Sequence, residues 1–340
     1  MSAASVSACR LAAVLCLGLA SCASTPGRAA GEPAAAPANP QVPVATSEQW
    51  LTRLDVAHPL VGKIWDVKAQ AFVDEATLGE RAAKARFVLV GERHDNPDHH
   101  RLQARVLQKV LDAGRRPALV LEMLEPAQQA AADSFLVSVV ASAAGFGAAV
   151  GWAKTSWPPF SDYQPIFEAA FAAKLRIVAG NLAQSDVKAL VKHGVSALPT
   201  ERVHQLRLDE ALPEALQTPL LEELRASHCG QLPESLLAPM ALAQRARDAE
   251  MARQLIAAGA ADGAVLIAGG GHARLDRAVP RYLALDAPGS SVVSISIREV
   301  RHDANDANAY AAEEGPFDYL WFTPRGSDED PCVAFKAPSK

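Results

Sequence analysis

Polar side chains that could do chemistry follow four short apolar runs of this sequence, each at the point where the run ends. In an open parallel sheet the carboxyl ends of the strands lie at one edge, and ligands bind there. We therefore expect these side chains to lie close together in the folded protein. They are Glu92 and His94 after residues 86–90, Glu122 after 117–121, Asn181 after 175–179, and His272 after 264–268.

Two imidazoles and two carboxylates support two kinds of chemistry. Glu92, His94, Glu122 and His272 could ligate a divalent transition metal such as zinc, manganese or iron, with open positions left for water. Without a metal, a Glu and His pair could act as general base and general acid. The structural alternative is that the glutamates pair internally and the histidines are hydrogen-bonded core residues.

Two adjacent histidines, His99 and His100, are weaker candidates. Neighbouring residues of a helix point about 100° apart, so at most one of them can face the site, and we expect the other to be solvated. Gly270 and Gly271 allow a ligand to approach the backbone closely. The triple glycine follows a late strand, whereas a dinucleotide-binding fingerprint opens the first βα turn. No G-x-S-x-G nucleophile elbow is present.

The elements that position these residues alternate between strand and helix patterns. This alternation predicts the α/β class, with a parallel sheet flanked by helices. Residues 183–260 are rich in Ala, Leu, Glu and Arg and are divided by five prolines, which predicts an inserted all-helical subdomain. Further strands are expected at 291–297 and 318–323, and helices at 98–111 with Asp98 as N-cap, from 126, at 164–174 and at 239–258.

The first 22 residues have the features of a secreted lipoprotein leader. A ten-residue apolar run, residues 11–20, is too short to cross a bilayer, which needs roughly 20 residues, and suits a signal peptide. Leu19-Ala20-Ser21-Cys22 resembles the bacterial lipobox, so we expect a signal peptide at 1–21 and a diacylglyceryl and palmitate anchor on Cys22. An ordinary signal peptide is the alternative. Ala23, in place of Asp, indicates delivery to the outer membrane.

Residues 22–46 are mostly Ala, Pro, Gly, Ser and Thr with almost no large apolar group, which predicts a flexible tether. The folded domain would then comprise residues 47–340 and lie in the periplasm or at the cell surface. With Cys22 acylated, Cys229 and Cys332 could pair in an oxidising compartment. Their separation in the sequence leaves this open.

Composition narrows the function classes. The chain has 340 residues, 49% of them hydrophobic and 21% charged, as in soluble globular proteins and unlike polytopic membrane proteins. Its formal net charge of −5 argues against nucleic acid as a partner.

Taken in order, seven segments of the chain resemble the ChaN-like haem-binding lipoprotein family, which belongs to the same superfamily as the Tiki and TraB proteins. The lipoprotein leader fits this family too. The matching segments are VLVGERHDNPDHHRLQ (88–103), LVLEM (119–123), SDYQPIFEAA (161–170), IVAGN (177–181), AQRARDAEMA (243–252), VLIAGGGHARLDRAVPRYL (265–283) and DYLWFTP (318–324).

The resemblance implies haem or iron acquisition at the outer membrane, with an outer-membrane haem or iron transporter as a partner. It also implies haem held between two subunits of a homodimer, with tyrosine as iron ligand, a residue that favours ferric iron. Tyr163 lies in the matching SDYQP segment beside an apolar stretch and is the expected ligand, with Asn181, Gly270 and Gly271 near the haem. The alternative is that Tyr163 packs on the core, as expected for Tyr282 and Tyr319.

The wider superfamily implies a different function. Tiki-type proteins are metal-dependent peptidases with two G-x-x-H motifs and a glutamate, and the erythromycin esterases are more distant relatives that use a Glu/His cluster. Here Gly91-Glu92-Arg93-His94 and Gly269-Gly270-Gly271-His272 satisfy the motif, and Glu122 matches the glutamate. We favour a haem-binding protein over an enzyme. A metal-dependent hydrolase and a non-catalytic envelope binding protein remain the alternatives.

Overall fold

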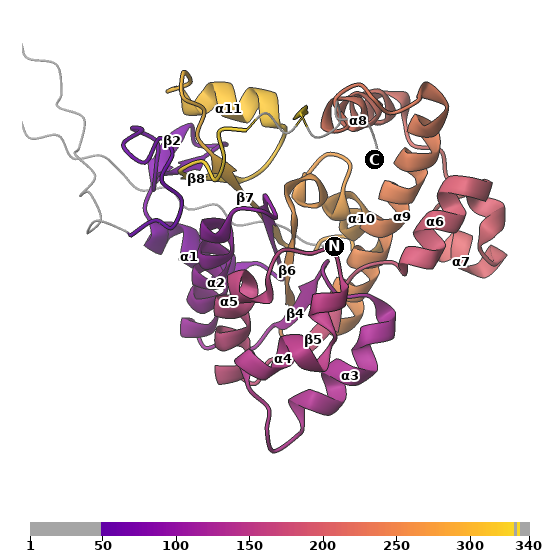
Figure 1. Ribbon diagram of the computed structural model, residues 1–340, viewed down its shortest axis with the longest axis horizontal. Coiled ribbons are helices and arrows are strands. Elements are labelled where there is room, and N and C mark those ends of the chain that lie inside the picture. Colours follow the sequence, from indigo (N-terminus) through magenta and orange to yellow (C-terminus); the bar gives the residue numbers. More distant parts are fainter. Residues whose placement is uncertain (1–48, 330–331, 334–340) are drawn as a thin grey trace, which may run out of the picture. The chain divides into compact units, whose positions relative to one another are not determined.

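The computed structural model describes residues 49–329 and 332–333, so the expected signal peptide, Cys22 and the tether lie outside the described residues. Eight strands form one sheet in the order β2-β1-β8-β7-β3-β6-β4-β5 (Figure 1). The strands are β1 (Ile64–Asp66), β2 (Ala71–Val73), β3 (Phe87–Glu92), β4 (Ala118–Leu121), β5 (Ile177–Ala179), β6 (Ala264–Gly269), β7 (Val292–Glu299) and β8 (Tyr319–Thr323).

The α/β class is confirmed, but the sheet is mixed rather than wholly parallel. The strands from β8 to β5 in the sheet order are parallel, with Glu92 of β3 opposite Gly269 of β6. β1 pairs antiparallel with both β8 and β2. These two strands have three residues each, which is too short for a period-2 pattern to identify them in the sequence.

Helices cover both faces of the sheet because successive strand residues point to opposite sides. Val88 and Val90 of β3 belong to one apolar core, and Phe87 and Leu89 belong to the other. The first core packs under α1 (Glu75–Lys84), α2 (Pro97–Asp112), α3 (Pro126–Leu136), α4 (Ala143–Ala149) and α5 (Phe160–Ala172). The second packs under α6 (Gln184–His193), α7 (Thr200–Gln205), α9 (Glu234–Ala258), α10 (Val279–Asp286) and α11 (Ala307–Glu314).

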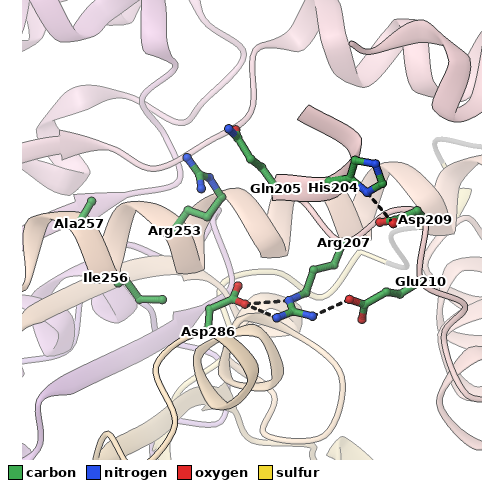
Figure 2. A pocket seen from close by; sticks show the side chains of 9 residues that line it. All are labelled: His204, Gln205, Arg207, Asp209, Glu210, Arg253, Ile256, Ala257 and Asp286. Carbon is green, nitrogen blue, oxygen red and sulfur yellow. Dashed lines mark hydrogen bonds and ion pairs between the residues drawn. The ribbon is translucent and has the colours of Figure 1, made fainter. Parts of the chain in front are cut away.

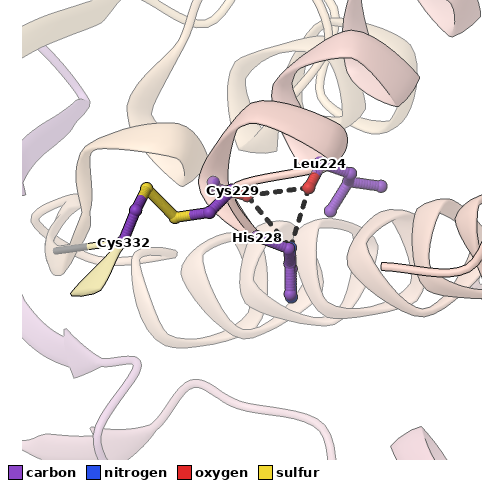
Figure 3. The surroundings of a disulfide bond; sticks show 5 residues. Leu224, His228, Cys229 and Cys332 are labelled. Carbon is purple, nitrogen blue, oxygen red and sulfur yellow. Dashed lines mark hydrogen bonds between the residues drawn. A yellow bond between two sulfur atoms is a disulfide. The ribbon is translucent and has the colours of Figure 1, made fainter. Parts of the chain in front are cut away.

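The segment from α6 to α9 contains helices and no strand among its residues, all of which the structure describes. α8 (Glu214–Ser227) packs on the first part of α9 through a small core of its own that includes Leu220, Leu224 and Leu237. Cys229, just after α8, is bonded to Cys332 near the carboxyl end of the chain (Figure 3). The cysteine pairing that the sequence left open is therefore present.

The start of α2 differs from the prediction. Asn96 is the N-cap, with its side chain accepting a hydrogen bond from the Asp98 amide at 3.0 Å, so Asp98 is not the cap. The Asp98 carboxylate instead accepts hydrogen bonds from the backbone of Leu51 and Thr52 at 3.0 and 2.8 Å. Because Asn96 caps the helix, the Asp98 carboxylate is free to make this tertiary contact.

Replacing Gly147 of α4 by alanine should lower the free energy of unfolding by about 1–3 kcal/mol, the usual cost of overpacking. A Cβ there would lie 2.5 Å from Cγ of Phe160. That ring cannot move freely, because it packs on Trp152 and Phe167 at centroid distances of 5.3 and 5.0 Å. Urea unfolding measures the effect.

The matched control is Gly147→Ala in a Phe160→Ala background, where the ring that the added Cβ would meet is absent. Alanine is the better helix former, so in this background the substitution should be neutral or stabilising. Equal effects of Gly147→Ala in the two backgrounds would contradict the packing argument.

Candidate functional site

Glu92, the last residue of β3, is the centre of a buried polar group. Its Oε1 accepts a hydrogen bond from the Tyr163 hydroxyl at 2.9 Å and lies 2.7 Å from Nδ1 of His94. Its Oε2 lies 2.7 Å from Nδ1 of His100. Strand β3 thus supplies the carboxylate, α2 supplies His100, and α5 supplies Tyr163.

The protonation states follow from these contacts. Nε2 of His100 lies 3.1 Å from the carbonyl oxygen of His94, so both ring nitrogens of His100 face acceptors and both carry protons. Burial would raise the pKa of Glu92, but the positive charge of His100 and the hydrogen bonds from His100 and His94 outweigh it and lower that pKa to about 2. The pKa of His100 is raised, because the charge of Glu92 outweighs the opposing effect of burial.

A second group surrounds Glu122, directly after β4. One carboxylate oxygen accepts a hydrogen bond from the Gly269 amide at 2.7 Å, and the other pairs with Arg247 and lies 3.4 Å from Nε2 of His272. Nδ1 of His272 lies 2.6 Å from Asp248. His272 is therefore held between two carboxylates.

Charge and burial oppose each other in this second group as well. Burial would lower the pKa of His272, yet the charges of Glu122 and Asp248 raise it to about 9. Burial would raise the pKa of Glu122, but His272 and Arg247 hold it well below its usual range. For Asp248 burial dominates and the pKa is raised. At neutral pH Glu122 is ionised and His272 is a cation.

His94 joins the two groups and is their exposed member. Its Nε2 lies 3.9 Å from Oε2 of Glu122, and 35% of its side chain is accessible, against 2% or less for both glutamates. The ring packs edge-on against Trp157 at 4.8 Å. A Cβ at position 269 would lie 2.8 Å from Nε2 of His94, so glycine there leaves room for the ring in this position. At 3.9 Å from Glu122 the imidazole is beyond hydrogen-bond distance, so the link between the two groups is electrostatic.

The structure brings the five predicted side chains together at the carboxyl edge of the sheet, as expected. They are Glu92, His94, Glu122, Asn181 and His272. Asn181 donates to the carbonyl of Glu122 at 2.9 Å and accepts from Arg247 at 3.0 Å. Gly270 and Gly271 lie in the turn before His272, where a Cβ on Gly271 would lie 3.3 Å from Glu223 of α8.

The prediction for the adjacent histidines was half right. His100 faces the site, but His99 is also fully buried rather than solvated. Nδ1 of His99 accepts from the Arg93 amide at 2.9 Å, and Nε2 lies 3.0 Å from the Thr323 hydroxyl on β8. This ring is neutral, because burial lowers its pKa to about 3. Thr323, the last residue of β8, thus packs against this turn of α2 and is the partner of His99.

Sequence reasoning missed the contribution of α9. Arg247 and Asp248 hold Glu122 and His272, and Nε2 of Gln244 lies 3.3 Å from His272. A signal was present, since positions i, i+3 and i+4 share one face of a helix. Three polar side chains at that spacing in an alanine-rich helix indicate a buried polar contact.

No set of three or more His, Cys, Asp and Glu side chains among the described residues is arranged to hold a metal ion. The donor atoms of Glu92, Glu122 and His272 face partners within the protein, as given above. The predicted metal site therefore has no ligand set in the part of the chain that the structure describes.

A cavity of about 500 Å³ lies elsewhere, between α7, the end of α9 and α10 (Figure 2). Its charged side chains pair with one another: Arg207 binds Asp286 and Glu210, and His204 binds Asp209. This cavity contains none of the residues at the sheet edge.

The fold and the site define an α/β protein with a network of buried acids and bases at the carboxyl edge of its sheet. The chain belongs to the family described as "Haem-binding uptake, Tiki superfamily, ChaN", which matches residues 78–283 and thus more than half of the chain. The predicted family is confirmed. The sequence has no significant match among the curated proteins.

A solved structure shows the same fold. The structure described as cofacial haem binding to ChaN of Campylobacter jejuni has a TM-score of 0.60 and 20% identity, and covers 76% of this chain and 95% of that chain. The type III effector HopBA1 follows at a TM-score of 0.39 and 15% identity, covering 73% and 92%. An erythromycin esterase mutant in its open conformation has a TM-score of 0.38 and 12% identity, covering 70% and 76%.

Proposed function

We propose that this protein binds haem and serves haem or iron uptake as a lipoprotein tethered to the outer membrane. Membership of the haem-binding uptake family carries the proposal, and the lipobox at Cys22 supports the tether. Among the described residues no helix is both long and apolar enough to pass through a bilayer. A haem-bridged homodimer and cooperation with an outer-membrane transporter belong to the same proposal.

The described side chains do not fit one part of the family resemblance, namely a tyrosine that ligates the haem iron from the protein surface. The chain has four tyrosines, and each is at most 5% exposed. The Tyr163 hydroxyl is bound to Glu92, and burial followed by the charge of Glu92 raises its pKa far above the usual value. Ligation by Tyr163 would require this hydroxyl to leave Glu92 and lose its proton. We therefore assign no ligand to the haem iron.

Titration of the mature chain carrying Cys22→Ser with hemin tests the proposal. We expect a saturable change of the Soret band, with light scattering showing a shift to the mass of a dimer. Absence of saturable binding would contradict haem binding, and binding without a change of mass would contradict the bridged dimer.

Tyr163→Phe should leave the Soret position unchanged while lowering the free energy of unfolding by about 1.5–3 kcal/mol, the usual range for a hydrogen bond to a charged group. The same titration and urea unfolding measure both effects. Tyr319→Phe, in β8, is the matched control. A shifted Soret band in Tyr163→Phe alone would identify Tyr163 as the iron ligand after all.

The hydrolase hypothesis has weaker support. The Glu and His side chains that it needs converge, but they satisfy one another, and no metal ligand set is found among the described residues. What favours acid–base chemistry is the exposed ring of His94, held by an ionised Glu92. A non-catalytic role for the whole network is equally consistent with these contacts.

A further inference from the structure

The loop that joins α3 to α4 carries the most exposed apolar side chains of the described chain. Val137, Val139 and Val140 are 86%, 104% and 69% exposed. The sequence from Ser134 to Ala153 contains no Asp, Glu, Lys, Arg or His, although 21% of the whole chain is charged. We call residues 137–140 the valine tip. Three exposed valines within four residues, in a segment without charged side chains from Ser134 to Ala153, favour an apolar environment over water.

The valine tip is held in place by the helices on either side of it. Phe135 at its start packs on Phe146 and Phe171, each at a centroid distance of 6.2 Å. Ser142 caps α4, its hydroxyl accepting from the Gly145 amide, and Ser138 donates to the carbonyl of Phe135 at 2.8 Å. The loop thus satisfies part of its own backbone polarity, which entry into a lipid interface requires.

The valine tip lies at the edge of the sheet opposite the Glu/His site. α3 begins after β4 ends at the site and runs back along the sheet, so its last turn lies near the start of the strands. The contact between Phe135 and Phe171 agrees with this, because Phe171 is in the last turn of α5, just before β5 begins. In Figure 1 the loop between α3 and α4 lies at the lower edge of the view.

We propose that the valine tip inserts into the surface of the lipid bilayer to which the protein is tethered, and so holds the Glu/His site facing away from the membrane. The proposal rests on the proposed function, in which Cys22 carries a lipid anchor. From residue 23 to residue 48 the chain could span about 90 Å when extended, at 3.3–3.6 Å per residue, so the tether leaves the orientation of the domain open. Because tethering raises the effective concentration of the tip at the membrane, a weak contact is sufficient to orient the domain.

Lipid fits the tip better than a second copy of this chain does. A stable dimer buries roughly 800 Å² on each partner, with a polar rim around the apolar centre. Three valines on one loop supply far less than this area, and the neighbouring sequence has no charged residue to form a rim. A small, uncharged apolar tip matches the depth of a bilayer interface.

A fluorescent label on the tip provides the direct test. In the mature chain with Cys22→Ser, the remaining cysteines are joined in the disulfide, so Val139→Cys can be labelled alone with an environment-sensitive dye. An N-terminal histidine tag and a nickel-chelating lipid replace the anchor and hold this chain on phosphatidylethanolamine–phosphatidylglycerol vesicles, where we expect a blue-shifted emission of at least twice the intensity. The matched control is Glu80→Cys on α1, where a glutamate side chain that is 74% exposed is replaced and no change is expected.

The second variant adds Val137→Asp and Val140→Asp to the labelled Val139→Cys chain, which should reduce the blue shift to that of the control and leave unfolding and the hemin titration unchanged. An unaltered blue shift in this variant, or no response of the Val139→Cys label, would overturn the proposal. A blue shift that appears without vesicles, together with dimer mass, would identify a second copy as the occupant instead. Failure of hemin to bind while the tip still binds vesicles would overturn the proposed haem function and leave this inference intact.

Discussion

Glu92→Ala is expected to lower the free energy of unfolding by about 3–5 kcal/mol, the usual cost of removing one partner of a buried charge pair. The carboxylate is fully buried and serves three partners, Tyr163, His94 and His100. Its loss would leave His100 with a proton facing empty space, or force that ring to become neutral. Urea unfolding at pH 6.5 measures the effect.

Two controls separate charge from volume. Glu92→Gln keeps the shape but replaces one acceptor oxygen with a donor that faces a protonated ring, so it should recover less than half of the loss. Glu80→Ala removes an exposed carboxylate and should change stability by less than about 0.5 kcal/mol. A loss below about 1 kcal/mol in Glu92→Ala would show that the network is not structural and would return attention to acid–base catalysis.

Stability is expected to fall by about 3 kcal/mol as the pH rises from 6.5 to 9, because of His272. The pKa of this ring is about 9 in the folded protein and 6.5 when unfolded. A group whose folded pKa is raised stabilises fully below its unfolded pKa, and the stabilisation is lost as the pH passes the folded value. Denaturation at pH 6.5, 7.5 and 9 would show this fall in the wild type and a flatter profile in His272→Gln.

Two other groups, Glu92 and His99, lower the stability as the pH falls below 6.5. The folded pKa of Glu92 is about 2, below its usual 4.5, so its stabilisation is lost as the pH falls through that range. His99 is buried as a neutral ring with a pKa of about 3, and the unfolded chain therefore gains a proton below pH 6.5 that the folded chain does not. The stability maximum should lie near pH 6.5. A profile that stays level or rises between pH 6.5 and 9 would contradict the charged state of His272.

The site residues at the strand ends could be predicted, because each follows directly after an apolar run that reads as a buried strand. Glu92, Glu122 and His272 were found from the apolar runs that precede them, since parallel strands bring their carboxyl ends to one edge. The strand pair β1 and β2 could not be predicted, because three residues carry no clear period. The sequence predicts Asp98 as the cap of α2, whereas Asn96 is the cap in the structure. Both side chains can cap a helix, and the tertiary contact of Asp98 with Thr52 decides between them.

The polar face of α9 shows a different limit. Arg247 and Asp248, together with Gln244, have the spacing of one helix face, which indicates a buried polar contact, but this spacing does not tell which residues they contact. Their role depends on α9 crossing the carboxyl edge of the sheet, which is a property of the whole fold. His99 was misjudged for the same reason, since its burial comes from β8, more than 200 residues later in the sequence.

The bond between Cys229 and Cys332 closes a covalent ring across a sequence separation of 103 residues, which contains α9 and the strands β6, β7 and β8. The three site residues on α9 (Gln244, Arg247 and Asp248) and His272 lie inside this ring, whereas Glu92 and Glu122 lie outside it. A recombinant chain produced in a reducing cytosol, or cut short before residue 332, would have the ring open. Haem titrations and unfolding curves from such material would describe a different molecule from the oxidised one.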